Sequence, residues 1–425
     1  MRRLYIYPAE DEEKMKKSIL YPIVGLAALI AAFVYYYVTL PAINIHSSGF
    51  WFFLLGAIVV VMVICLLRRA GREIFTSGVT SMQFSLKDFP AVKWLGILFL
   101  VLLAAYGIGT LLSSPVINAK KYQQLMTVES RNFAEDIAEA DYRSIPLLDK
   151  DSAALLGDRK MGSLVDMVSQ FEVADDYTQI NYNNVAVRVT PLVYASPVKW
   201  LTNQRNGIPA YIRIDMTTQD TECVMLEEGI RYSKSEYFNR NLYRHLRFHF
   251  PTYIFGDQLF FEIDDDGVPY WVCPVKKFNI GLFGGETVGR VVLVNAVTGE
   301  CTDYAVEDVP TWIDKVYSAE LLMQLYDYHG MYQHGFFNSI LGQRDCLVTT
   351  DGYNYLAIDD DVWVYTGITS VNGDQSNVGF VLMNQRTMET RYYEVEGATE
   401  LSAMSSAQGQ VQNLGYRASF PLLLN

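Results

Sequence analysis

Gly289 to Glu307 reads GRVVLVNAVTGECTDYAVE: an apolar run, a short polar turn and a second run in which apolar and polar residues alternate. Short runs rich in Val, Ile, Tyr and Phe that end at polar residues are typical of β-strands. The Asn that opens the turn can bond its own backbone and tolerates the bend. The stretch therefore predicts a β-hairpin, which is the template for the sequence after residue 184.

The same template occurs again near the C-terminus, where Val378 to Glu396 reads VGFVLMNQRTMETRYYEVE. When Asn295 is aligned with Asn384, identical residues also pair at Thr298 and Thr387, Glu300 and Glu389, Tyr304 and Tyr393, Val306 and Val395, and Glu307 and Glu396. An earlier stretch, Ala210 to Gly229, fits more loosely through Asp215, Thr218, Asp220, Leu226 and Glu227. The lead-in strands are also alike, since FEIDDDGVPYWV around Asp264 resembles LAIDDDVWVYTG around Asp359. Such self-similarity predicts repeated structural units.

Each unit is expected to run strand, turn, strand and then helix, with the helices at Ser233 to Phe248, Pro310 to His329 and Glu400 to Leu414. One unit alone has too small a core to be stable, so the units should pack together. The sequence thus predicts an α+β fold with two or three antiparallel-sheet-plus-helix repeats. Their expected boundaries are 184–255, 256–340 and 341–425, after a helical stalk or lead-in at 113–183.

An apolar strand that runs into D/N-x-x-T-G-E and a second strand resembles the PepSY domain family, most closely at Val291 to Cys301. The third hairpin has Met388 in place of the Gly, and the first has Gln219. Members of that family are inhibitory or chaperone-like segments of secreted peptidases. Others are tandem modules in membrane-anchored regulators of cell-wall hydrolases and sensor kinases of Gram-positive bacteria. The whole layout also resembles an uncharacterised membrane-protein family of such bacteria. The resemblance implies a binding or regulatory role and supplies no catalytic residue.

Three uncharged apolar runs precede this domain, at Ile19 to Thr39, Phe50 to Leu67 and Trp94 to Leu112. Each is close to the ~20 residues that a helix needs to cross a hydrocarbon core of ~30 Å. A secretory signal would have a shorter apolar core and a small-residue cleavage site. We therefore expect a three-helix membrane anchor at 19–112, with the lipid bilayer as a partner.

The orientation of the anchor is predicted by its positive residues, because Lys and Arg in short loops stay on the cytoplasmic side. They collect before the first run and between the second and third runs, at Arg2, Arg3, Lys14, Lys16, Lys17, Arg68, Arg69, Arg72, Lys87 and Lys93. The loop between the first two runs carries none. The aromatic residues Tyr35 to Tyr37 and Trp51 to Phe53 fit an interfacial belt on the other side. Three spans would place residues 1–18 in the cytoplasm and everything after Ser113 outside it.

The charge of the chain is divided unequally between these parts. Residues 1–112 hold ten of the 34 Lys and Arg residues and six of the 47 Asp and Glu residues, so they carry +4 and the remainder −17. A domain this acidic repels phosphate backbones, so we exclude nucleic acid as a partner. The absence of charged residues from the three runs argues against an ion path through them. Small residues of the first run, at Gly25, Ala27, Ala28, Ala31 and Ala32, leave homo-oligomer formation open.

Four groups of residues invite a metal or phosphate interpretation, but each fits a simpler one. His245 and His249 share a helix face without the Glu of a zinc-protease motif, and His329 and His334 are not at helical spacing. The Asp clusters beginning at Asp264 and Asp359 could offer oxygens to calcium, although hairpin turns with solvated carboxylates explain them as well. Gly281 to Gly289 leads into a strand and provides no helix N-terminus for a phosphate. We predict no metal, no cofactor and no catalytic residue.

Four cysteines follow the apolar runs: Cys223, Cys273, Cys301 and Cys346. In an oxidising compartment they would allow two disulfides in three pairings, and unpaired buried thiols are the alternative.

The function expected from these features is a membrane-anchored extracytoplasmic binding or regulatory protein that contacts another membrane or envelope protein. The candidate partner-binding loop lies in YDYHGMYQHGFFNS and comprises Tyr326, Tyr328, Tyr332, Phe336 and Phe337. Aromatic residues are enriched at protein interfaces, but these could instead fill the seams between repeats. The alternative function is a cell-envelope hydrolase or a metal-dependent enzyme with a scattered active site, which would require titratable residues to converge in one pocket.

Overall fold

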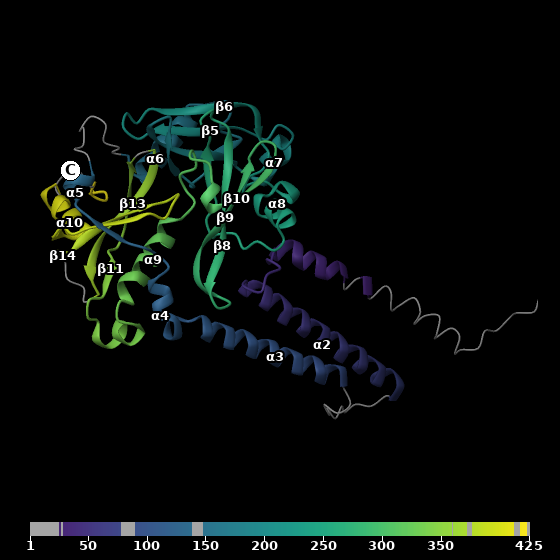
Figure 1. Cartoon of the computed structure of the whole chain (residues 1–425). Coiled ribbons are helices and arrows are strands. Elements are labelled where there is room, and N and C mark those ends of the chain that lie inside the picture. The colour runs from purple at the N-terminus through teal and green to yellow at the C-terminus, as the bar shows by residue number, and fades with distance from the viewer. Residues whose placement is uncertain are drawn as a thin grey trace, which may run out of the picture.

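The computed structural model describes residues 25–26, 29–77, 90–137, 148–358, 360–371, 376–411 and 417–422 (Figure 1). Two of its helices are long and apolar enough to cross a membrane, α2 (Ser48–Ser77) and α3 (Pro90–Ser113). A shorter apolar helix covers Leu29–Thr39. The rest of the first expected span and residues 1–18 lie largely outside the described residues. The expected number of three spans therefore stays a prediction.

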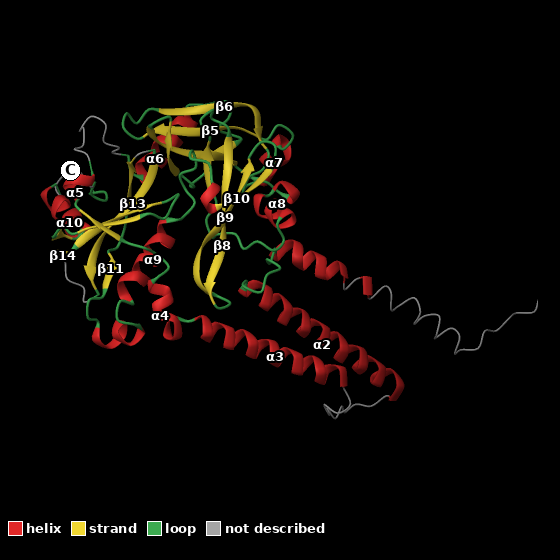
Figure 2. Ribbon diagram, viewed as in Figure 1, coloured by secondary structure: helices red, strands yellow, loops and turns green. Residues whose placement is uncertain are grey.

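The β-rich domain, residues 115–422, contains three main sheets and is a mixed α+β fold (Figure 2). The first sheet has the order β2-β4-β5-β6, with β3 also paired to β4, and comprises β2 (Phe171–Val173), β3 (Thr178–Tyr182), β4 (Val185–Tyr194), β5 (Ile208–Asp215) and β6 (Thr221–Ile230). The second has the order β10-β9-β8-β7 and comprises β7 (Phe260–Ile263), β8 (Pro269–Ile280), β9 (Gly284–Asn295) and β10 (Cys301–Ala305).

The third sheet has the order β1-β16-β15-β13-β11, with β12 also paired to β13. It comprises β1 (Glu129–Arg131), β11 (Leu347–Thr349), β12 (Asn354–Ile358), β13 (Asp361–Ser370), β15 (Gly379–Asn384) and β16 (Thr390–Tyr393). A small ribbon pairs β14 (Ser376–Asn377) with β17 (Gly397–Ala398). The helices of the domain are α4 (Pro115–Gln123), α5 (Phe133–Asp136), α6 (Lys150–Gly162), α7 (Pro197–Asn203), α8 (Leu242–His249), α9 (Ala319–Met331) and α10 (Glu400–Gln410).

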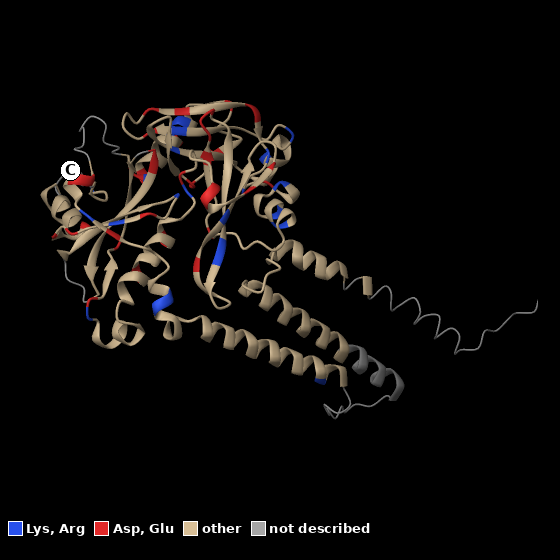
Figure 3. Ribbon diagram, in the orientation of Figure 1, with Lys and Arg blue, Asp and Glu red and all other residues tan. Residues whose placement is uncertain are grey.

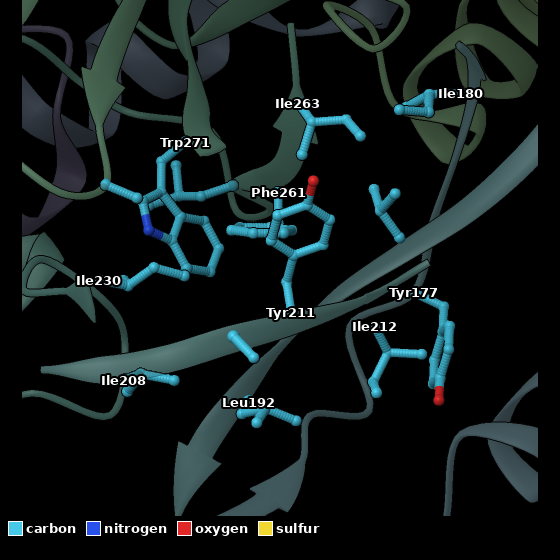
Figure 4. Close-up of a cluster of buried hydrophobic side chains, with 14 of the residues drawn as sticks. Tyr177, Ile180, Leu192, Ile208, Tyr211, Ile212, Ile230, Phe261, Ile263 and Trp271 are labelled. Atoms are coloured by element: carbon cyan, nitrogen blue, oxygen red, sulfur yellow. The ribbon is translucent and has the colours of Figure 1, made fainter. Parts of the chain in front are cut away.

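The second sheet is the centre of the domain because both of its faces are buried. In β9, Val292 and Val294 pack on the first sheet, whereas Val291 and Leu293 pack toward α9 and the third sheet. A strand covered on both faces reads as a continuous apolar run, which accounts for VVLV. Figure 4 shows the core on the first-sheet side, where Phe261 lies between Trp271 and Tyr211.

The three hairpins expected from the sequence share one turn geometry. A side-chain oxygen of Asp215, Asn295 or Asn384 accepts two backbone N–H groups at 2.8–3.0 Å. The Thr three residues later accepts a further backbone N–H at 3.2–3.3 Å. The next residue has a positive φ in every case: 62° at Gln219, 79° at Gly299 and 65° at Met388. Because these bonds are local, each turn forms from its own sequence.

The domain is fixed to the apolar helices at two places. The tip of the β8–β9 hairpin packs on the C-terminal end of α3, where the backbone N–H groups of Leu282 and Phe283 donate to Ser113 Oγ at 2.8 and 3.1 Å. Gly109 makes room, since a Cβ there would lie 2.6 Å from the Leu282 side chain. On the other side, Arg247 Nε donates to Leu40 O at 2.9 Å, just after the helix Leu29–Thr39.

Several expected elements have different bounds in the structure. The helix expected at Ser233 to Phe248 is a 3₁₀ turn at Phe238–Arg240 followed by α8, and that expected from Pro310 begins only at Ala319. The helix expected to end at Leu414 is described to Gln410. The helical stalk or lead-in expected at 113–183 contains the helices α4, α5 and α6, but it is not separate from the sheets. Its β1 pairs in parallel with β16, and its β2 and β3 pair with β4, so it belongs to the sheets.

Candidate functional site

A cavity of about 560 Å³ lies at the junction of the three sheets and is our candidate site. Its walls come from β3 and β4 of the first sheet, β7 of the second, β12 of the third, and the N-terminal end of α9. Aromatic side chains provide much of the lining, at Tyr243, Phe260, Tyr353, Tyr355 and Phe420. The volume is within the range of ~300–1,000 Å³ that is usual for small-molecule pockets.

Two buried cations line this cavity, Arg188 on β4 and Lys315 just before α9. Their exposed fractions are only 4% and 6%. Arg188 Nε donates to Leu148 O at 3.4 Å, and Lys315 Nζ donates to Tyr355 OH at 3.3 Å. Within the described part of the chain, neither side chain has a carboxylate oxygen within 4.0 Å. Charged groups are seldom buried without a partner, so this arrangement is unusual.

Lys315 is held in place by a fully buried acid on the neighbouring strand. Glu262 of β7 accepts the backbone N–H of Asp314 at 3.0 Å and that of Lys315 at 2.9 Å. These two bonds fix the backbone of the segment before α9. The ammonium then lies over the Tyr355 ring at 4.4 Å and near the Phe260 ring at 5.6 Å. Contact with the ring faces offsets part of the cost of burying the charge.

The carboxylates that line the cavity already accept hydrogen bonds from other groups. Asp176 is paired with Lys234 at 2.7 Å and Asp257 with Lys276 at 2.8 Å. Glu320 accepts from Tyr353 OH at 2.8 Å, and Asp149 caps α6 through the N–H of Ser152 at 2.7 Å. The acids of the cavity wall are therefore engaged, whereas the two cations retain free donors.

Burial governs the protonation of these cations. It lowers the pKa of Lys315 to about 8, with a further lowering from nearby Arg188 that Glu262 and Glu320 oppose. Burial also lowers the pKa of Arg188. A Lys with a pKa of about 8 is charged at neutral pH. Gln179, opposite Arg188 in the β3–β4 pairing, is fully buried, and neither polar atom of its amide has a hydrogen-bond partner among the described residues.

Comparisons of the chain with models of known protein families, with curated proteins and with solved structures found no match.

The histidines suggested by the sequence lie elsewhere and are engaged in other contacts. His245 Nε2 lies 2.7 Å from Gly299 O and 3.3 Å from Cys301 Sγ. The short contact makes Nε2 a donor, so it cannot take the thiol proton, and burial raises the pKa of Cys301 to about 11. His249 Nδ1 lies 2.8 Å from the His245 carbonyl oxygen, so its ring also bonds to backbone. No group of three His, Cys, Asp or Glu side chains suited to a metal occurs within the described ranges.

The other histidines, the Asp clusters and the cysteines named from the sequence lie in different surroundings. His329 lies 3.1 Å from Gln123 O, and His334 lies 2.9 Å from the exposed carboxylate of Asp345. Asp264 accepts backbone N–H groups of its own turn, as expected for a hairpin acid, while Asp359 lies outside the described residues. The cysteines Cys223, Cys273, Cys301 and Cys346 are all free thiols in the structure.

The candidate partner-binding loop is mostly internal. Tyr326 and Tyr332 are buried, with exposed fractions of 4% and 9%, and Tyr328 packs edge-on to Tyr122 with ring centres 4.8 Å apart. Phe336 packs on Tyr332. Only Phe337 is largely exposed, at 69%. Tyr328, Tyr332 and Phe336 therefore fill a seam next to α4, and Tyr326 lies in the core between α9 and the sheets. Of the five aromatics, Phe337 alone is available at the surface.

Sequence reasoning missed both cations of the cavity. In VAVRVTPLVY, Arg188 alternates with apolar residues, which is the pattern of a solvent-facing position on a half-buried strand. Lys315 follows an Asp in an unremarkable segment. Nothing in either segment indicates that the other lies beside it, because the two are brought together only by the packing of three sheets.

Proposed function

We propose that this chain is a membrane-anchored, extracytoplasmic binding or regulatory protein, in which three spans carry PepSY-like repeats on the outer face of the membrane. The observation that carries the binding role is the cavity at the sheet junction, with its two buried and incompletely bonded cations. A fold that needed these charges only for stability would pair them. Arg188 and Lys315 are therefore interpreted as binding groups.

The face of the domain next to the apolar helices supports the membrane anchor. Basic residues of α8 lie beside the end of the helix Leu29–Thr39 (Figure 3), and the Arg244 guanidinium is 4.4 Å from the Tyr37 ring centre. Phe238, whose carbonyl accepts a hydrogen bond from Arg244 Nη1 at 3.3 Å, is more than half exposed. Basic and aromatic residues next to exposed apolar side chains are typical of a membrane interface. They also supply positive charge on an otherwise acidic domain.

The regulatory half of the proposal is tested by crosslinking the full chain in its native membrane and identifying what copurifies. A specific envelope or membrane protein that is recovered with the wild type, and lost when Arg188 and Lys315 are replaced, is the expected result. Phe337→Ala is a useful second variant because this aromatic is exposed. Recovery of the chain by itself would contradict a protein partner.

The topology is tested separately by thiol labelling. A Cys is introduced at the exposed Leu155 of α6, and its counterpart at Lys87 in the loop before α3, which we expect to be cytoplasmic. A membrane-impermeant maleimide should label the first in intact cells and the second only after the membrane is opened. The reverse pattern would place the β-rich domain in the cytoplasm and overturn the proposal.

A further inference from the structure

The cavity at the sheet junction has the features of an anion site, and this inference rests on the proposed binding function. Arg188 lies on β4 of the first sheet and Lys315 in the segment before α9, yet both line one cavity, and each is more than nine-tenths buried. A guanidinium has five N–H donors and an ammonium three. Only one donor of each has a protein acceptor within the described residues, and the Arg188 contact is long at 3.4 Å.

We propose that this cavity binds a small organic ligand through a carboxylate or phosphate group that lies between Arg188 and Lys315. An oxyanion would accept the unused Nη and Nζ donors and neutralise two like charges at once. Charge-assisted hydrogen bonds of this kind are about twice as strong as neutral ones, and Arg presents two parallel donors to such a group. The aromatic walls at Phe260, Tyr353 and Tyr355 would hold the organic part of the ligand.

Within the described residues, no carboxylate takes the place of this anion. The charge of Asp149 favours the protonated form of Arg188, and the charges of Glu262, Glu320 and Asp314 favour that of Lys315. None of these carboxylates lies within 4.0 Å of either cation. Asp149 is committed to the N-cap of α6 and Glu320 to the hydroxyl of Tyr353.

Binding is measured by calorimetry on the full chain in detergent micelles at constant ionic strength, with inorganic phosphate and succinate as separate probes. At least one probe should bind with millimolar or better affinity and raise the thermal midpoint. Arg188→Met and Lys315→Met should each weaken binding at least about tenfold, the usual cost of losing one charged hydrogen bond. The two probes distinguish a phosphate from a carboxylate ligand.

Two controls make the result decisive. Arg344→Met removes an exposed positive charge from a residue that does not line the cavity, and it should leave binding unchanged. Arg188→Lys keeps the positive charge and should recover part of the anion affinity that Arg188→Met loses. If Arg188 had a purely structural role, these substitutions would change only the midpoint of thermal unfolding. The inference would be overturned if Arg188→Met and Lys315→Met bound the probes as tightly as the wild type does. It would also be overturned if neither probe bound to the wild type. If the anion test failed but crosslinking still recovered a partner protein, the proposed function would stand without the anion site. If an anion bound but no partner was recovered, the regulatory part of the proposed function would be lost.

Discussion

The three hairpin turns and the junction between the sheets bury polar groups in opposite ways. In the turn after β15, Arg386 makes two bonds to Asp361, at 2.7 and 2.8 Å, and Asn384 donates to the same carboxylate at 2.8 Å. At the junction, Arg188 has one long bond to a backbone carbonyl. Removing one partner of a buried pair leaves an uncompensated charge, so the pair at Asp361 is expected to matter for stability. The incomplete bonding of Arg188 is what our proposal assigns to a ligand.

The largest effect should come from breaking the complete pair. Arg386→Met leaves Asp361, whose side chain is 12% exposed, without its cation. An uncompensated buried charge costs about 3–5 kcal/mol. Because Arg386 is partly exposed, we expect the unfolding free energy to fall by about 3 kcal/mol, the lower end of that range. Thermal or urea unfolding of the full chain in micelles would measure it. Arg344→Met, whose side chain is 79% exposed, is the matched control and should cost under about 0.5 kcal/mol.

The junction should respond to pH through Lys315. Burial lowers the pKa of Lys315 to about 8 in the fold, where the charged neighbours are Arg188, Glu262, Glu320 and Asp314. The ammonium also donates to Tyr355 OH. The unfolded chain therefore binds more protons than the fold above pH 8, so this group makes the chain more stable as pH rises toward 10. The gain approaches roughly 3 kcal/mol above the unfolded pKa. Lys315→Met should abolish the rise, and an unchanged pH profile would contradict the burial of a charged ammonium.

A smaller loss is expected at the acid that positions Lys315. Glu262→Gln keeps the shape of the side chain but replaces one acceptor oxygen with an NH₂ group that faces a backbone N–H of the segment 314–315. One buried donor is then unpaired, which costs about 1–3 kcal/mol. Unfolding midpoints should fall for this variant and remain unchanged for Glu222→Gln, whose side chain is 57% exposed. Anion affinity should fall as well, because Lys315 loses its fixed position.

The same contrast explains what the sequence could predict. The hairpins were predictable because Asn295, Thr298 and their counterparts form the turns through bonds within a few residues. The parallel pairing of β1 with β16 was not, since Glu129 to Arg131 has no apolar alternation and its partner is far along the chain. The candidate site could not be predicted from the sequence for the same reason, because Arg188 and Lys315 are brought together only where the three sheets meet. Whether the hairpins descend from one PepSY-like unit stays a prediction.

The smallest predicted effect tests whether the three hairpin turns share one backbone geometry that is set by local hydrogen bonds. Gln219 is exposed and has a φ of 62°, a left-handed conformation that costs an L-residue roughly 1–2 kcal/mol and glycine almost nothing. Gln219→Gly should therefore stabilise the chain, by about 0.5–1 kcal/mol after the extra freedom of glycine in the unfolded state is subtracted. Gly299→Ala, at the same turn position, should destabilise it, because the new Cβ would lie 2.4 Å from the Tyr232 ring. Opposite signs at equivalent positions would show that the turn geometry is shared and that only its surroundings differ. If both substitutions destabilised the chain, the side chain of Gln219 would be making a contribution of its own, and the first turn would no longer match the second.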